Sequence, residues 1–324
     1  MSRSAAVTLL PFALVLVLAL GIGTAGFFAA PSRSSVSAAT PTSVTMTGFP
    51  STTAATATNK PAPTTIASAT PTDARSDATS MLAVHNELRA AIGAPAVRGD
   101  DRVTAAAQRH AEYLARNNTI GHDETAGADG FTGETTRDRL AAQGYNDATA
   151  SEVATSFGSG VEGVRSLWLL PYHRLGLMHP QAIVAGWGHA EVGGRSTTVG
   201  VIVYDFDAPA ADVVRAPAAG QRVQPSWEGE ESPDVLPAGA SRPVGYAVML
   251  VASAAKPVEL RSAKITDASG RDVAYHVVPQ IYERDYVALV PAQPLAPASR
   301  YRVHLDLIVA GTDRVEEWEF LTEP

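Results

Sequence analysis

Three polar residues, His122, Glu152 and His173, have the side chains that metal binding or proton transfer requires. Two imidazoles and one carboxylate can bind a divalent cation such as Zn²⁺, with Glu152 as a further ligand or as a general base. Each of the three lies beside a segment whose pattern predicts a helix or a strand. Whether they act together therefore depends on the elements that carry them.

The region from residue 76 to residue 208 predicts a domain with helices first and strands late. Helices are expected from about Ser76, after Asp100 or Asp101, at about 135–143 and at about 161–170. Pro171 is expected to end the last helix. The sequence predicts two strands at 183–187 and 197–204, joined by a turn at Gly193 and Gly194, and a third strand after Glu152. This order indicates a layered α+β fold.

Downstream, the composition changes twice. Residues 209–238 are rich in Pro, Ala and acidic residues, which is typical of a linker. Residues 239–324 consist of short, alternating apolar runs separated by turn signals such as Ser269-Gly270, so they predict a small all-β sandwich. Because the two regions differ in periodicity, each is expected to have its own core.

The N-terminal part predicts a location outside the cytoplasm. Residues 1–30 contain the uncharged apolar stretch Val7–Ala30, which is about as long as a bilayer span. It is expected to be either a retained membrane anchor or a cleaved signal. Residues 31–75 are dominated by Ser, Thr, Ala and Pro and predict a disordered stalk. The folded regions would then be membrane-anchored through the N-terminal segment, or secreted.

Composition excludes several classes of function. The chain of 324 residues has a formal net charge of -8, which argues against a nucleic-acid partner. It contains no cysteine, so a disulfide framework, a thiolate zinc site and a cysteine nucleophile are all excluded. It also lacks a nucleophile elbow and a phosphate-binding glycine-rich loop. Metal-assisted or carboxylate and imidazole chemistry remains.

Five stretches of the first region occur in a particular order and spacing. They are HNELRAAIGAP at 85–95, VTAAAQRHAEYLARNNTIGH at 103–122, RDRLAAQGY at 137–145, Ser151-Glu152-Val153, and LLPYHRLGLMHP at 169–180. In these stretches the chain resembles the bacterial branch of the CAP superfamily (cysteine-rich secretory proteins, antigen 5, pathogenesis-related class 1). The resemblance implies a three-layer α-β-α sandwich with one open cleft.

The resemblance also implies which residues line that cleft. Family members place two His and one or two Glu there, and the matching positions are His122, Glu152 and His173. The family's Gly-Glu-Asn is Ser-Glu-Val here, so the carboxylate is kept while its neighbours differ. No second Glu matches; Glu124, Glu134 and Glu162 are candidates by proximity in the sequence only. The residues most simply explained as structural are His110, Arg174, Trp168 and Trp187.

The last thirty residues resemble the final strands of bacterial immunoglobulin-like domains. The residues that carry this resemblance, at the same spacing, are Leu295, Pro297, Tyr301, Trp318, Phe320 and Thr322.

Three hypotheses for function follow. The leading one is a binding role at the cell envelope, with a divalent cation, a small apolar molecule, a peptide or an envelope component as ligand. The second is a peptidase-like hydrolase in which His122 and His173 hold Zn²⁺ or another divalent cation. The third is a structural surface spacer.

Overall fold

The computed structural model describes residues 71–324. The anchor segment within residues 1–30, and all but the end of the 31–75 stalk, lie outside the described residues. Among residues 71–324, no helix combines the length and the hydropathy that a membrane span needs.

The first domain is built on an antiparallel sheet with the strand order β1-β3-β2. These strands are β1 (Thr149–Thr155), β3 (Arg195–Tyr204) and β2 (Ala182–Val192). Gly193 and Gly194, both with positive φ, connect β2 to β3, as the sequence predicted. Glu152 lies inside β1 rather than before it, opposite Val201 of β3.

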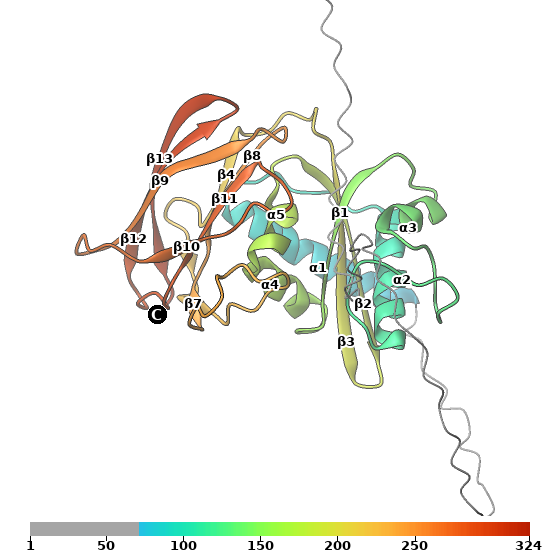
Figure 1. Ribbon diagram of the computed structural model, residues 1–324. Helices are drawn as coiled ribbons and strands as arrows, with labels where there is room; N and C mark the ends of the chain where they lie inside the picture. The colour runs from blue at the N-terminus through green and yellow to red at the C-terminus, as the bar shows by residue number, and fades with distance from the viewer. Residues whose placement is uncertain (1–70) are drawn as a thin grey trace, which may run out of the picture. The chain divides into compact units, whose positions relative to one another are not determined.

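Helices cover both faces of this sheet, as Figure 1 shows. On one side α2 (Asp101–Asn117) packs Val103, Ala107 and Leu114 against Val199, Val201 and Val203. On this side α3 (Thr136–Ala142) lies next to α2. The other side carries α1 (Pro71–Ala91), α4 (Val161–Leu169) and α5 (Pro171–Met178), whose apolar residues pack with Val153 and Ile202. The α+β class and the α-β-α layering are therefore as expected.

Local signals place most helix ends where the sequence predicts them. Asp100 caps α2, because its Oδ1 accepts the backbone N–H of Arg102 at 2.9 Å. Asn118 ends α2 in the left-handed conformation, and Thr135 forms a capping box with Asp138 at the start of α3. The expectation for Pro171 was incomplete. It follows the end of α4, but it is also the first residue of α5, where a proline needs no N–H partner.

Two glycines let α2 approach the sheet closely. A Cβ on Gly186 would lie 2.3 Å from the backbone nitrogen of Thr104, and one on Gly188 would lie 2.4 Å from Cα of Gln108. Any larger residue would push the helix away from β2. Gln108 uses this closeness, because its side-chain amide pairs with the backbone N–H and C=O of His189 on the outer edge of β2.

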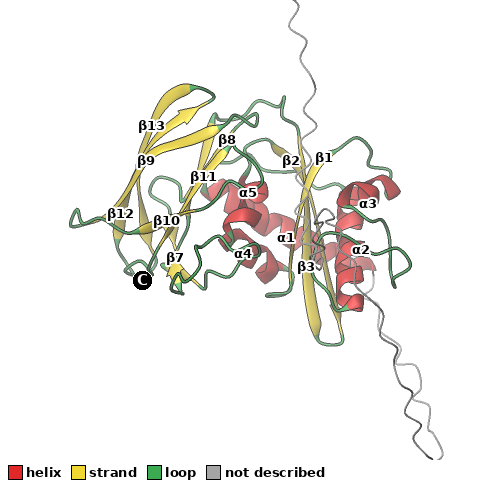
Figure 2. Ribbon diagram, in the orientation of Figure 1, coloured by secondary structure: helices red, strands yellow, loops and turns green. Residues whose placement is uncertain are grey.

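The C-terminal region contains strands and loops only (Figure 2). One four-stranded sheet has the order β10-β11-β8-β4 and a second has the order β5-β13-β12-β9. Their strands are β4 (Val213–Ala216), β5 (Arg222–Val223), β8 (Val248–Ala252), β9 (Val258–Asp267), β10 (Tyr275–Val277), β11 (Tyr286–Pro291), β12 (Arg300–Val309) and β13 (Thr312–Thr322), and β6 (Ser226–Trp227) pairs with β7 (Val244–Gly245).

Residues 209–238 do not form the linker that their composition suggested. Within them, β4 pairs with β8, β5 pairs with β13 and β6 pairs with β7. Short edge strands tolerate the prolines of this segment, because an edge strand can leave one side of its backbone unpaired. Composition therefore hid three strands, of which β4 and β5 pair with strands that lie far away in the sequence.

The expectation of two separate cores was also wrong. Along β8, Val248, Leu250 and Ala252 face the second C-terminal sheet, whereas Met249 and Val251 belong to the same apolar cluster as α4 and α5. β11 alternates in the same way, with Val287 and Leu289 on one face and Ala288 and Val290 on the other. Successive side chains of a strand point to opposite faces. The β8–β11 sheet is therefore buried on both sides and joins the two regions.

We predict that Met249→Ala destabilises both regions together, by about 2–5 kcal/mol, because it opens a cavity in the shared core. Urea unfolding followed by far-ultraviolet circular dichroism would report the helices, and hydrogen exchange of β12 and β13 would report the distal sheet. Val315→Ala, at a 62% exposed position, is the control and should leave both signals unchanged. Loss of the helical signal without faster exchange in β12 would contradict the shared core.

Candidate functional site

Glu152 occupies a position that an isolated carboxylate could not tolerate. It lies in the middle of β1 and is 2% exposed. Ser151 and Val153 point toward the α5 and α4 side, where Ser151 hydrogen bonds to the hydroxyl of Tyr204. The alternation of the strand therefore turns Glu152 toward α2 and α3. A buried carboxylate needs charged partners on that face.

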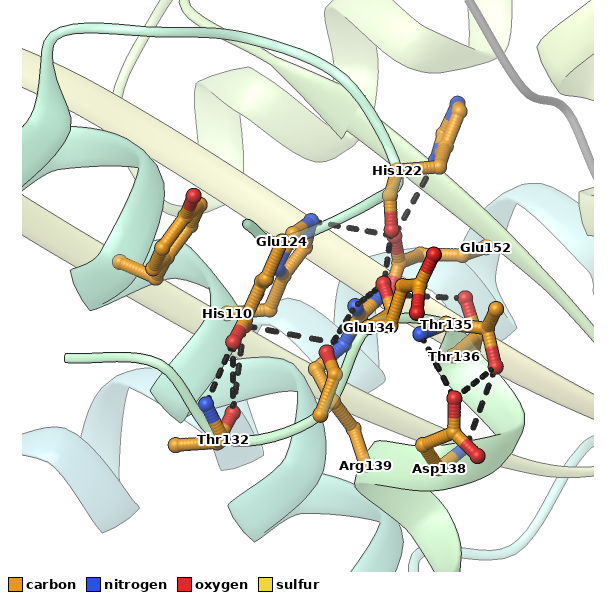
Figure 3. Close-up of polar contacts among 12 residues, drawn as sticks. His110, His122, Glu124, Thr132, Glu134, Thr135, Thr136, Asp138, Arg139 and Glu152 are labelled. Atoms are coloured by element: carbon orange, nitrogen blue, oxygen red, sulfur yellow. Dashed lines mark hydrogen bonds and ion pairs between the residues drawn. The ribbon is translucent and has the colours of Figure 1, made fainter. Parts of the chain in front are cut away.

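Three side chains provide these partners, and Figure 3 shows them converging on the carboxylate. Arg139 of α3 donates from Nη2 to Oε2 of Glu152 at 2.8 Å. His122 donates from Nδ1 to Oε1 at 3.1 Å, and Nε2 of His110 lies 3.3 Å from the same oxygen. Both oxygens of Glu152 are thus engaged within the domain.

Glu124 is a second buried carboxylate in the same network. Its Oε1 accepts from Nδ1 of His110 at 2.9 Å, and its Oε2 accepts from the backbone N–H of Thr132 at 2.5 Å. Nε of Arg139 lies 3.9 Å from Oε1 of Glu124. His110 therefore bridges the two carboxylates, and its Nε2 also donates to the carbonyl of Gly121 at 3.1 Å.

The electrostatics of the network balance internally. Burial alone would favour neutral Glu152, but His110, Arg139 and the hydrogen bond from His122 hold its pKa well below the usual range. Burial likewise opposes ionisation of Glu124, and His110, Thr132 and Arg139 lower its pKa. Both ring nitrogens of His110 face acceptor oxygens. Because His122 contacts Glu152 through Nδ1, its Nε2 is the ring nitrogen that the network leaves unused.

His173 has a different partner. Its Nδ1 lies 2.6 Å from Oε1 of Glu231, and the same carboxylate accepts the backbone N–H groups of Tyr172 at 3.1 Å and of His173 at 3.0 Å. The side chain of Glu231 is completely buried. It closes the first turn of α5, which has no capping side chain of its own. Glu231 therefore attaches the segment after β6 to the first domain.

The neighbours of His173 serve the same junction. Tyr172 donates its hydroxyl to the carbonyl of Pro279 at 3.0 Å. Arg174 is fully buried; it hydrogen bonds to the carbonyls of Trp168 and Leu169 and, at 3.0 Å, of Ala247, and its guanidinium lies over the ring of Tyr246. The expectation that Arg174 satisfies carbonyls is confirmed.

The three residues predicted to share one cleft are therefore divided between two sets of contacts. His122 and Glu152 are in direct contact on the α2 and α3 side of the sheet, whereas His173 belongs to the α5 side and contacts Glu231. Within residues 71–324, no group of three or more His, Cys, Asp or Glu side chains has the arrangement of a metal site. What the Glu152 network can do chemically is orient one imidazole, His122, whose Nε2 can accept a proton or a hydrogen bond.

Sequence reasoning missed Arg139 and Glu231 and underrated two other contributors: His110, which was expected only to be packed and hydrogen bonded, and Glu124, a candidate by proximity in the sequence only, both belong to the network. A usable signal existed for two of them, because His110 and Arg139 lie on the helix faces that carry buried residues. Glu231 could not be found near the motif, because it follows His173 by 58 residues. Trp168 and Trp187 are buried, as expected.

Comparison with known families supports the assignment of the first domain. Residues 82–204 match the model of the cysteine-rich secretory protein family, CAP. The matched residues run from within α1 to the end of β3, so they include every element of the α-β-α layers and the whole Glu152 network. No curated protein matches the chain.

Several solved structures are similar over part of the chain. An extracellular protein with an SCP domain from Bacillus anthracis is 19% identical, covering 43% of this chain and 45% of that one, with a TM-score of 0.34. A cysteine-rich secretory protein from Staphylococcus aureus is 17% identical, covering 42% and 41%, with a TM-score of 0.31. An outer surface protein from Borrelia burgdorferi is 18% identical, covering 40% and 93%, with a TM-score of 0.34. Because these sequence identities and TM-scores are low, the match to the family model remains the basis for placing a CAP domain at residues 82–204.

The lowered pKa values of Glu124 and Glu152 make a prediction about acid stability. In the unfolded chain both groups titrate near 4.5, so below that pH the unfolded state binds more protons and the folded state loses stability. We expect the free energy of unfolding to fall steeply between about pH 5 and about pH 3. Glu152→Gln should be less stable near neutral pH but lose less on acidification. Exposed Glu317→Gln is the control; a Glu152→Gln profile parallel to wild type would contradict the prediction.

Replacing Glu231 should weaken the junction at α5. Glu231→Gln keeps the size of the side chain but exchanges one acceptor oxygen for a donor, so at least one of three N–H groups loses its partner. We expect a loss of about 1–3 kcal/mol in the free energy of unfolding. The neighbouring exposed Glu230→Gln is the matched control. Faster hydrogen exchange in 171–174 of the Glu231 variant alone would locate the effect, and equal stability of both variants would show that the pair contributes nothing.

Proposed function

We propose that this protein is an extracytoplasmic CAP-domain protein that binds a component of the cell envelope without cleaving it. The observation that carries this proposal is the complete internal pairing of Glu152. A general base must be free to take a proton from a water or a substrate. Both oxygens of Glu152 already accept hydrogen bonds inside a buried network that keeps the group ionised. Its role is to hold His122 in place.

The proposed contact surface surrounds Nε2 of His122. The segment between α2 and α3, which contributes His122 and Thr132 to the network, also carries Ile120 and Phe131, which are 46% and 39% exposed. Exposed apolar side chains on the same segment as a hydrogen-bond acceptor suit a ligand that combines an apolar surface with a donor group. A small apolar molecule with a hydroxyl or amide, or a peptide segment of an envelope protein, has this chemistry.

We propose that the remaining parts of the chain hold the CAP domain in position at the cell envelope. We propose that Val7–Ala30 anchors the protein in the membrane or directs its secretion, and that residues 31–75 act as a spacer. The alternating strands and the Leu295 to Thr322 pattern favour an immunoglobulin-like sandwich for the C-terminal sheets. Their extensive packing on α4 and α5 favours a rigid continuation of the CAP domain over an independent module.

The alternative, a metal-dependent hydrolase, needs His122 and His173 as ligands to one cation. In the described structure each of these rings hydrogen bonds through Nδ1 to a different glutamate. Within residues 71–324, no group of three or more His, Cys, Asp or Glu side chains that could hold a metal ion includes these two rings. The geometry therefore favours the binding role.

We predict that purified full-length protein in detergent co-sediments with isolated envelope fractions, and that the double variant His122→Ala/Phe131→Ala reduces this binding at least tenfold. A matched control, Val315→Ala, removes an exposed apolar side chain from β13 and should bind normally. In parallel, calorimetric titration with Zn²⁺ and a peptide-hydrolysis assay would test the alternative. Zn²⁺ binding that is lost in both His122→Ala and His173→Ala, with hydrolysis lost in Glu152→Gln, would overturn the proposal.

A further inference from the structure

A small cavity of about 30 Å³ lies between the first domain and the loop that precedes β11. None of the residues of the Glu152 network lines it. Its apolar wall includes Leu175, Phe206 and Val251, and its polar end is formed by His179, Glu283 and Asp285. Thr149 of β1 and Tyr204 of β3 also line it, so the cavity is assembled from β1, α5, the end of β3, the segments that follow α5 and β3, and the C-terminal region.

His179 has a buried nitrogen with no hydrogen-bond partner among residues 71–324. The residue is 6% exposed, and its Nδ1 accepts the backbone N–H of Gln181 at 3.1 Å. Because Nδ1 accepts, the ring proton must be on Nε2. Nε2 is buried and makes no hydrogen bond, and the closest carboxylate oxygen, Oδ2 of Asp285, is 3.5 Å away. A buried N–H donor without an acceptor is costly, so the cavity lacks a group that its chemistry calls for.

The two carboxyl groups at the same end need donors. Asp285 is buried, and His179 is its one ion-pair partner among the residues that the structure describes. Burial and the neighbouring Asp285 raise the pKa of Glu283 to about 7. Near neutral pH, Glu283 can therefore accept or donate, whereas Asp285 next to it acts as an acceptor.

These requirements select one chemical class. An ammonium group or a metal cation could satisfy the carboxylates, but neither can accept the Nε2–H of His179. An anion could accept that proton, but it would be repelled by Asp285. A hydroxyl group accepts and donates at once, so it can join His179 to Asp285. The cavity is also larger than the roughly 10–15 Å³ that one water requires, and its apolar wall suits carbon-bound hydrogens.

We propose that this cavity binds the hydroxymethyl group of a neutral carbohydrate, with the hydroxyl oxygen accepting from Nε2 of His179 and its proton donated to Asp285. The methylene carbon then lies against Leu175 and Val251. The sugar ring stays at the mouth, next to Phe206, whose ring is stacked on Tyr204. Flat apolar rings commonly receive the C–H face of a ligand of this kind. The site is separate from the surface proposed at His122.

The test uses full-length protein in detergent and two sugars that differ in one atom. Methyl β-D-glucopyranoside has the hydroxymethyl group, and methyl 6-deoxy-β-D-glucopyranoside lacks its oxygen. Saturation-transfer NMR should show millimolar binding of the first sugar and binding at least tenfold weaker for the second. n-Butylammonium chloride, the competing class, should bind less well than the glucoside.

Two variants connect the binding to the cavity. Asp285→Asn directs an N–H group toward the N–H of His179, and Glu283→Ala removes a half-buried carboxyl with little risk to the fold. Each should weaken glucoside binding about tenfold, while the exposed Glu230→Gln should bind like wild type. Far-ultraviolet circular dichroism would confirm that the variants are folded. Any of the following results would overturn the proposal: equal binding of the two sugars, tighter binding of butylammonium than of the glucoside, or unchanged glucoside binding by both variants. Absence of any sugar binding would also overturn it, because the cavity would then hold water only.

Discussion

Burial of the β8–β11 sheet on both of its faces is the constraint on which the rest of the structure depends. One face packs against the distal sheet, and the other completes the apolar cluster that α4 and α5 begin. This arrangement places the segment after β6 against α5, where Glu231 caps the helix and contacts His173. It also brings Val251, Glu283 and Asp285 to His179. Neither feature could exist in a CAP domain standing alone.

The polar interior of the CAP domain follows a second rule, which is that a buried charge must be neutralised where it lies. Glu152 enters the interior because β1 alternates, and Arg139 and His110 then offset its charge at hydrogen-bond distance. His110 serves Glu124 as well, so two carboxylates share one imidazole. Such a closed set contributes specificity of packing, since removing one member would leave another unpaired. The same closure leaves only His122 able to act outward.

Both candidate binding surfaces therefore arise from incomplete pairing at the margin of a well-paired interior. Nε2 of His122 is the outward nitrogen of an imidazole fixed by Glu152, and Nε2 of His179 is an unpaired donor at the end of a small cavity. The two differ in character: the first presents a ring nitrogen on a segment that also carries exposed apolar side chains, and the second presents a proton beside two carboxyl groups. They should accordingly prefer different ligands.

Local patterns in the sequence determined the α+β class, the order of helices and strands, and the caps of α2 and α3, because these depend on periodicity and capping chemistry. The contact of His122 with Glu152 followed from the short family motif.

Three features were decided only by the tertiary structure. The strands within 209–238 form because distant partners complete their backbone hydrogen bonds. Met249 and Leu250 belong to different cores because the sheet has neighbours on both faces. His173 contacts Glu231 rather than Glu152 because the side chains of consecutive elements face different layers of the fold. The spacing of residues along the chain does not show which layer a later segment will cover.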